Sequence, residues 1–193
     1  VIIRCIEDGE VAEYYARRTG PVTARIVENA PSQRRQHVGD WVVFDAELVY
    51  PPPEDEAERE RFVPTYPQVH VLQAGGYGNS WLVDGVHPGE PAIDALRKDI
   101  EARGWTLWVH SRDDYRLIDP DNADAFDAED PQSGLPGVLF TVALPEAVPP
   151  LELHRALVMA TAGWPHRMCW MRLAEACDQD TTPHMQAIER YGL

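Results

Sequence analysis

The stretch from Tyr66 to His110 sets the strongest limit on the fold of this chain, because every local signal in it agrees with its neighbours. Residues 69–73 and 81–84 are rich in residues that favour strands. Between them lies the segment 74–80, AGGYGNS, whose glycines and asparagine suit the positive-φ positions of a tight turn. We therefore predict that the two strands pair as a β-hairpin.

The same glycine-rich segment admits a second interpretation, a loop whose backbone N–H groups bind a phosphate. Phosphate-binding loops normally open onto the N-terminus of a helix, whereas here a strand follows. The segment also lacks the Gly-Lys-Ser/Thr ending of a P-loop. The hairpin turn is therefore the favoured interpretation.

A helix and a further strand complete the stretch. The helix is predicted to begin near Pro91, a residue suited to a first turn, and to end at Gly104, a common terminator. Apolar residues at i, i+3 and i+7 mark the helix face that packs on a sheet. Residues 105–110 form the next predicted strand.

Other strands are predicted from apolar–polar alternation or from short apolar runs. They cover residues 1–7, 22–26, 41–50, 115–118 and 138–144. The segment 115–118 follows a polar turn, so we expect it to form a second hairpin with the strand before it.

Three segments interrupt the strands. Asp8 is typical of a helix cap, and the residues after it predict a short helix through Arg18. Residues 51–67 hold five prolines around an acidic stretch, and they predict an exposed excursion with one or two helical turns. Residues 119–130 are acidic and contain no base. They depart from the EF-hand loop pattern, so a solvated acidic face is favoured over a calcium site.

From Pro149 onward the pattern changes to three consecutive helices, with Pro165 and Pro183 as first-turn residues of the second and third. The predicted fold class is α+β: a mainly antiparallel sheet of about seven strands, packed by one long central helix and by the C-terminal helices. We expect a single domain over 1–193, with a sheet-rich body over 1–148 and a helical segment over 149–193.

Acidic residues dominate the charge of the chain, whose formal net charge is −15 with 32 acids and 17 bases. This balance argues against binding to nucleic acid, which requires a basic face, and it leaves a basic protein partner open. Every base except Lys98 is arginine, which is typical of a high-GC bacterium.

Three cysteines, Cys5, Cys169 and Cys177, are odd in number and too sparse for a disulfide framework, which favours a reducing compartment. The first ten residues lack the apolar core of a secretory signal. No window approaches the roughly 18 apolar residues of a membrane-spanning helix. We therefore expect a cytoplasmic protein that does not enter a membrane.

The C-terminal helices carry the densest group of metal-ligand and nucleophile types. On a helix, at about 100° per residue, His166, Cys169, Leu173 and Cys177 fall in one narrow stripe. A buried seam, with the cysteines acting as small apolar residues, is the favoured interpretation. Two alternatives remain open: a zinc site completed by His184, although the spacing matches no standard pattern, and a reactive thiol at Cys169.

The best candidates for catalysis are His70, His110 and Asp113, which lie on or beside predicted strands. If the sheet brings these strands together, the two imidazoles and the carboxylate line one cleft and could transfer protons. No Ser–His–Asp order or nucleophile-elbow motif supports this hypothesis, and a polar histidine on a strand face is the simpler interpretation.

Tryptophans supply a separate indication of binding. Trp105 and Trp108 have opposite strand parity, so one faces the core and the other faces outward or into a pocket. Trp108, close to His110, is the best single indication of a ligand or partner surface. Our predicted ligand- or partner-binding residues are Trp108, His166 and Cys169.

Two functions are consistent with these observations. The first is an acidic cytoplasmic binding protein that engages a protein partner, such as an inhibitor or immunity-type factor, through its acidic segments. The second is a small-molecule enzyme or ligand-binding domain with a cleft near His70, Trp108 and His110. No motif specifies a cofactor or metal, so we expect none, and the sequence does not specify an oligomeric state.

Overall fold

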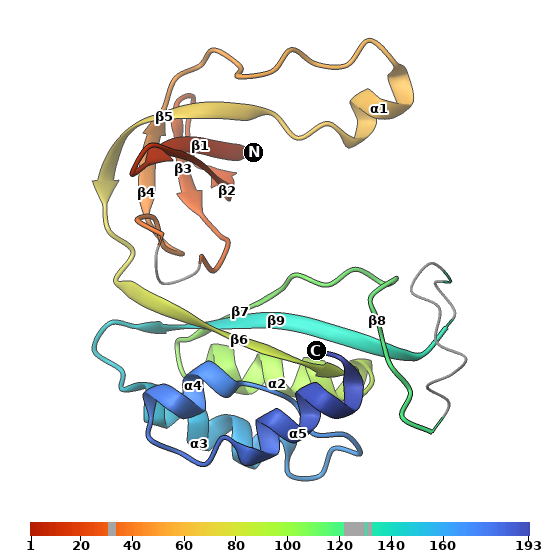
Figure 1. Cartoon of the computed structure of the whole chain (residues 1–193). Helices are drawn as coiled ribbons and strands as arrows, with labels where there is room; N and C mark the ends of the chain where they lie inside the picture. The colour runs from red at the N-terminus through yellow and green to blue at the C-terminus, as the bar shows by residue number, and fades with distance from the viewer. Residues whose placement is uncertain (31–33, 122–129, 131–132) are drawn as a thin grey trace. The chain divides into compact units, whose positions relative to one another are not determined.

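The computed structural model of the chain describes residues 1–30, 34–121, 130 and 133–193. The chain divides into two compact units, Val1–Asn79 and Ser80–Leu193 (Figure 1). The α+β class is confirmed, because strands and helices both occur and are largely segregated along the chain. The prediction that residues 1–193 form one domain stays a prediction.

The predicted arrangement of the strands is wrong. Instead of one antiparallel sheet of about seven strands, the chain forms a closed five-stranded barrel and a separate four-stranded sheet. The predicted single long central helix is also wrong, since the described part of the chain contains five short helices and the longest has 13 residues.

The first unit is the barrel, whose strands follow each other in chain order. Its strands are β1 (Ile2–Glu7), β2 (Glu10–Arg18), β3 (Thr23–Ile26), β4 (Trp41–Phe44) and β5 (Thr65–Gln73). Consecutive strands are antiparallel, so the fifth strand runs in the same direction as the first. The barrel therefore closes through a parallel pairing of β1 with β5, in which Ile2 lies opposite Thr65.

Strand β2 replaces the helix predicted from Asp8 to Arg18. Asp8 and Gly9 adopt positive φ values of 51° and 89° and connect β1 to β2 as a tight hairpin. This is the Asp-Gly turn signal, which the helix-cap interpretation of Asp8 overlooked. Residues 12, 14 and 16 of β2 are buried in the barrel, so the period is that of a strand.

Strand β4 ends at Phe44, earlier than the predicted end at residue 50. Three prolines at 51–53 follow, and prolines cannot donate to a strand ladder. The excursion before β5 contains the predicted helical turns as α1 (Glu56–Arg61), in which no residue is buried.

The second unit is a sheet with helices packed on it. The sheet has the order β6-β9-β7, and β8 pairs with β9. Its elements are β6 (Tyr77–Val86), α2 (Glu90–Ala102), β7 (Thr106–Val109), β8 (Arg116–Leu117), β9 (Leu135–Pro145), α3 (Pro150–Thr161), α4 (Met171–Ala176) and α5 (Thr182–Tyr191). Helix α2 confirms the helix predicted near Pro91, and all three C-terminal helices are present.

Both predicted hairpins of this region are wrong. Strand β5 belongs to the barrel and β6 to the other sheet, so the glycine-rich segment does not connect paired strands. Strand β8 pairs with β9 instead of β7, with Leu117 opposite Leu135. The second C-terminal helix is also shorter than predicted, because it begins at Met171 and leaves Pro165 outside any helix.

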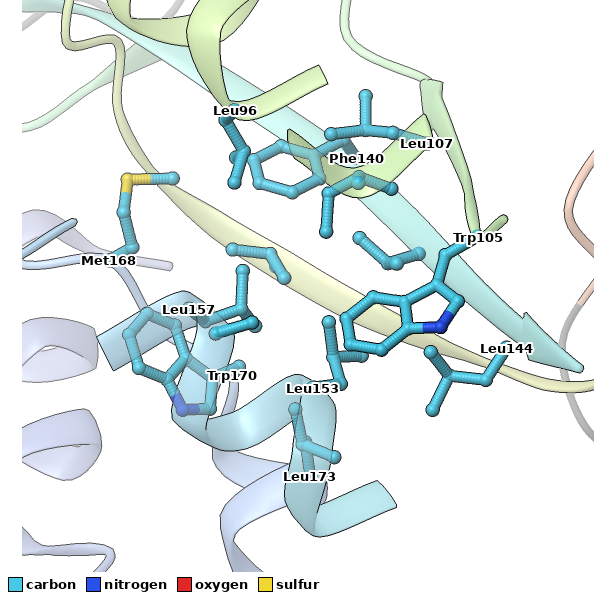
Figure 2. Packing of buried hydrophobic residues seen from close by; sticks show 14 of the residues in the cluster. Leu96, Trp105, Leu107, Phe140, Leu144, Leu153, Leu157, Met168, Trp170 and Leu173 are labelled. Carbon is cyan, nitrogen blue, oxygen red and sulfur yellow. The ribbon is translucent and has the colours of Figure 1, made fainter. Parts of the chain in front are cut away.

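An apolar core fills the second unit between the sheet and the helices (Figure 2). The predicted face of α2 is buried, with Ile100 fully shielded from solvent. Phe140 from β9 and Leu153 and Leu157 from α3 are also fully buried. Among the described residues, no helix combines the length and apolar character required to cross a bilayer.

The hairpin turn at Asp8–Gly9 leads to a stability prediction. Gly9→Ala places a Cβ in open space but in a positive-φ conformation, so we expect a loss of about 1–2 kcal/mol in the free energy of unfolding. Gly163→Ala is the matched control, since it too meets open space but has no positive φ. Denaturant unfolding monitored by tryptophan fluorescence measures both. Equal stability of the two variants would contradict the turn.

Candidate functional site

A polar concave region of the second unit lies at the N-terminal half of α2. We call it the α2 hollow; its volume is about 410 Å³, and its walls come from α2, the end of β7 and the start of β9. It is lined by His87, Glu90, Ile93, Asp94, Arg97, Val109, Ser111, Arg112, Asp113, Pro136, Gly137 and Val138. This volume lies in the range of small-molecule sites.

Charges of both signs line the α2 hollow. Three carboxylates, from Glu90, Asp94 and Asp113, face the same space as the guanidinium groups of Arg97 and Arg112. Among the described residues, Asp94, Arg112 and Asp113 take part in no salt bridge. The hollow therefore presents unneutralised charges of both signs to a ligand.

Apolar side chains complete the lining beneath these charges. Ile93 on α2 and Val138 on β9 are almost completely buried, and Val109 ends β7 beside them. Arg97 is held across the helix–sheet contact, because its Nη1 donates to the carbonyl of Leu107 at 3.4 Å. The packing of α2 on the sheet thus fixes the position of this charged lining.

His87 is the most constrained polar side chain of the α2 hollow. Its Nδ1 accepts a hydrogen bond from the backbone N–H of Gly89 at 3.0 Å. The neutral ring therefore carries its proton on Nε2, which lies 3.5 Å from Oε1 of Glu90. Since both ring nitrogens are occupied, His87 is better placed to donate a hydrogen bond than to remove a proton.

A second concave region, the β8 hollow, adjoins the first and shares Ser111 and Arg112 with it. Its volume is about 470 Å³. It is lined by His110, Ser111, Arg112, Asp114, Tyr115, Arg116 and Leu139. The segment 111–113 is thus the wall between two hollows, and Ser111 is fixed there because its Oγ accepts from the backbone N–H of Leu139 at 3.1 Å.

Tyr115 anchors the β8 hollow to the sheet. Its hydroxyl donates to both carboxylate oxygens of Asp84 at 3.0 Å. Burial raises the pKa of Asp84, and the hydrogen bond from Tyr115 opposes that rise. The ring packs against Gly137, where a Cβ would lie 2.7 Å from it, so this position of β9 requires glycine.

Two of the three predicted catalytic residues line adjoining hollows. His110 lines the β8 hollow and Asp113 the α2 hollow, on either side of the shared wall. The His110 Nε2 lies 2.9 Å from Oγ1 of Thr141. His70 is exposed on β5 in the other compact unit.

Trp108 lies on β7 and is half-buried, whereas Trp105 is buried in the core, as expected from their opposite parity. Trp108 lines neither of the two hollows.

His87 lines the α2 hollow, but the sequence alone did not distinguish a functional role for it from a structural one. The motif His-Pro-Gly-Glu-Pro at 87–91 could have identified His87 from the sequence, because it places a histidine directly before the N-terminus of a helix.

The predicted stripe of His166 and Cys169 along one helix is wrong, because both precede α4. Cys169 instead forms a β-bridge with Asp84, whose backbone N–H donates to the Cys169 carbonyl at 2.9 Å. His166 lies beside α5, with its Nδ1 3.1 Å from the hydroxyl of Tyr191. No group of three or more His, Cys, Asp or Glu side chains arranged to hold a metal ion occurs in the described part of the chain.

Two imidazoles, those of the buried His184 and the half-buried His154, flank Trp170. The Trp170 Nε1 donates to Nδ1 of His154 at 3.3 Å, and its backbone N–H donates to Nδ1 of His184 at 3.4 Å. Burial lowers the pKa of His184, and the nearby His154 lowers it further. Burial is also the main reason that the pKa of His154 is lowered. Both rings are therefore structural acceptors at neutral pH.

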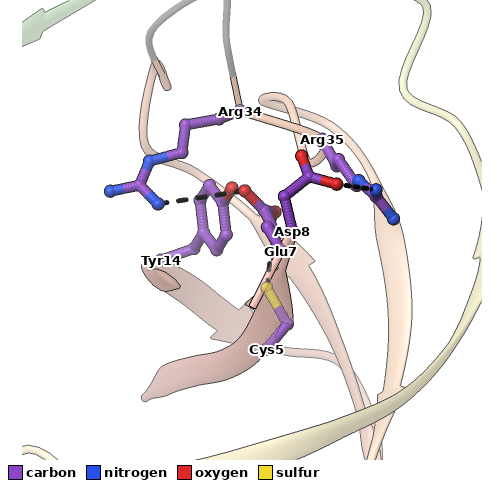
Figure 3. A network of polar contacts seen from close by, with 6 residues as sticks. All are labelled: Cys5, Glu7, Asp8, Tyr14, Arg34 and Arg35. Atoms are coloured by element: carbon purple, nitrogen blue, oxygen red, sulfur yellow. Dashed lines mark hydrogen bonds and ion pairs between the residues drawn. The ribbon is translucent and has the colours of Figure 1, made fainter. Parts of the chain in front are cut away.

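A polar network closes the β1–β2 end of the barrel (Figure 3). The buried Glu7 accepts from the hydroxyl of Tyr14 at 2.6 Å and from the thiol of Cys5 at 3.4 Å, both on Oε1. Its Oε2 has no hydrogen-bond donor among the described residues, and the nearest cation is Arg34 Nη1 at 3.9 Å. Burial raises the pKa of Cys5 to about 12, and the charge of Glu7 adds to this effect. Burial also raises the pKa of Tyr14 well above its ordinary value, and the hydrogen bond to Glu7 adds to it.

Comparisons with protein-family models, with curated proteins and with solved structures found no match for this chain.

Thiol chemistry gives a direct test of the cysteine environments. Burial raises the pKa of Cys169 and of Cys177 as well as that of Cys5, so we expect all three thiols to react slowly with a thiol reagent at pH 8. The rate should rise with pH as thiolate forms. The same protein in guanidinium chloride is the control and should label rapidly. Rapid labelling of native Cys169 would show that it is a reactive thiol.

Proposed function

We propose that this chain is a binding protein and that the α2 hollow receives a small molecule that carries both a cationic and an anionic group. The observation that carries the proposal is the mixed lining: three carboxylates and two guanidinium groups around one small space. Arginine binds a ligand carboxylate or phosphate through paired N–H donors, and carboxylates bind an ammonium. Ile93, Val109 and Val138 would contact the apolar part of the ligand.

The chemistry of the candidate nucleophiles and bases favours binding over catalysis. A thiol nucleophile requires a lowered pKa, whereas burial raises the pKa of each cysteine. A general base requires a bare nitrogen that faces the substrate, whereas His87 uses Nδ1 to accept from Gly89 and directs Nε2 towards Glu90. His87 is therefore better suited to hold a ligand than to transform it, and none of the three cysteines lines the hollow.

Blocked amino acids test the proposed ligand class by isothermal titration calorimetry. We expect free amino acids to bind more tightly than their methyl esters, which lack the anion, and their N-acetyl derivatives, which lack the cation. Arg112→Gln should weaken binding of the free amino acid about tenfold, because one charge-assisted contact is lost. It should leave the methyl ester unchanged, because the anionic partner of Arg112 is already absent from the ester.

Arg155→Gln, an exposed substitution on α3 away from the hollow, is the matched control and should have no effect. Asp94→Asn should show the reverse pattern: binding of the free amino acid should weaken, whereas binding of the N-acetyl derivative, which lacks the cation, should not. Equal binding of the three ligand forms, or equal loss in the control, would contradict the proposal.

A second function, docking to a basic protein partner, is favoured by the structure of the acidic excursion. Helix α1 buries no residue in the barrel, yet its ends are ordered by local hydrogen bonds. Asp55 caps the helix by accepting from the backbone N–H of Glu58 at 3.0 Å. Arg59 donates to the backbone carbonyls of residues 53 and 54 at 3.1 and 2.9 Å. The excursion thus holds a local shape while its acidic side chains remain exposed.

The second acidic segment, residues 119–130, lies mostly outside the described residues, as do the acidic face and the calcium site weighed for it from the sequence.

Charge-matched variants test the docking function. Glutamine at positions 54, 56, 58 and 60 removes four exposed glutamates and leaves the cap Asp55 in place. We expect a salt-sensitive complex with a basic partner protein to be lost in pull-down experiments with this variant. The control variant carries glutamine in place of the exposed glutamates at positions 101, 146, 152 and 175. It has the same net charge as the first variant and should still bind the partner. Equal loss in both variants would contradict docking through α1.

A further inference from the structure

A third concave region lies at the C-terminal helix, and we propose that it is a separate site for a phosphate group. This α5 hollow has a volume of about 720 Å³ and is formed by the segment 165–167 and one side of α5. It is lined by Pro165, His166, Arg167, Pro183, Gln186, Ala187, Glu189, Arg190 and Tyr191. None of these residues lines the α2 hollow or the β8 hollow.

The charge of its lining is the first argument. The chain is strongly acidic, with 32 acids and 17 bases. Arg167 and Arg190 nevertheless make no salt bridge with any described residue, although both line this hollow. Glu189 is the one carboxylate among the described lining residues. The lining is therefore net positive in a strongly acidic chain.

The polar groups between the two arginines are held in position. Tyr191 is buried at 5% exposure, and its hydroxyl lies 3.1 Å from Nδ1 of His166. The two rings meet edge to face, with centroids 5.8 Å apart. Because Nδ1 is directed at the tyrosine, the ring leaves Nε2 as the nitrogen that a ligand in the hollow could contact.

The backbone on both sides of the hollow is also constrained. The Tyr191 carbonyl accepts from the backbone N–H of Ile118 at 3.0 Å, which attaches the end of α5 to the chain next to β8. Pro165 and Pro183 restrict the backbone where it enters the hollow. Arg190 lies over the ring of Tyr191, with Cζ 5.7 Å from the centroid. Restricted backbone and side chains lower the entropy lost when a ligand binds.

These features favour an anionic ligand, and we take phosphate as that ligand. Guanidinium groups match the oxygens of a phosphate through paired N–H donors, so the two arginines suit an anionic ligand of this kind. The α2 hollow contains carboxylates that would repel such a ligand, whereas here Glu189 is outnumbered by Arg167 and Arg190. The α5 hollow is thus a phosphate site that stands independently of the function proposed above.

Inorganic phosphate is the probe that tests this site. Titration of the full chain at low ionic strength, followed by ¹H–¹⁵N NMR, should shift the backbone resonances of His166, Arg167, Arg190 and Tyr191 in a saturable manner. Arg167→Gln and Arg190→Gln should each weaken phosphate binding about tenfold, which corresponds to about 1.4 kcal/mol. Both side chains are exposed, so neither change removes a core contact.

Arg172→Gln on α4 is the matched control, because this arginine is exposed and lies outside the hollow. Phosphate affinity should be unchanged in it and in Arg112→Gln, the variant that tests the α2 hollow. Titration with chloride at the same ionic strength should not shift the same resonances. Equal weakening by Arg172→Gln, or an equal response to chloride, would overturn the proposal, as would saturation unaffected by Arg167→Gln and Arg190→Gln.

Discussion

The packing of helices against strand β9 is the interaction on which the second unit depends. This 11-residue strand pairs with β6, β7 and β8, so it is the element that joins the sheet. Its buried side chains, among them Phe140 and Val142, are fully shielded from solvent. The start of the same strand lines the α2 hollow, and residue 139 lines the β8 hollow. Strand β9 therefore contributes residues to both the core and the candidate site, and a change that moved this strand would alter both.

Local patterns of sequence predicted the elements that carry their own signal. Helix α2 was identified because its apolar residues repeat at helical spacing, and β9 because apolar residues alternate along it. The prediction was wrong at β2, where Asp8 is typical of a helix cap but also belongs to an Asp-Gly turn signal, and the structure forms the turn. Both patterns were in the sequence, and the strand period of residues 12, 14 and 16 would have resolved them.

Strand pairing could not be predicted in the same way, because it is set by contacts between distant residues. Strand β6 follows β5 directly, yet it pairs with β9 about fifty residues later while β5 pairs with β1 and β4. The same limit applies to the site. His110 and Asp113 are close in sequence and line adjoining hollows, whereas the predicted grouping with His70 assumed a single sheet and the strand of His70 belongs to the barrel. Arg97 and His87 join the α2 hollow through the packing of α2 on the sheet, which no local motif records.

The closure of the barrel has a consequence for how the chain folds during synthesis. Domains emerge from the ribosome N-terminus first, and contacts form once both partners are available. All five barrel strands are available when residue 73 has emerged. Strand β6 can pair only after β9 has emerged, and β9 ends at Pro145. The core of the second unit can form only later, when the helices that follow β9 have emerged. During that interval the exposed strand edge of β6 is open to pairing with other chains. A folded barrel with an unfinished sheet attached to it is therefore the species in which misassembly would begin.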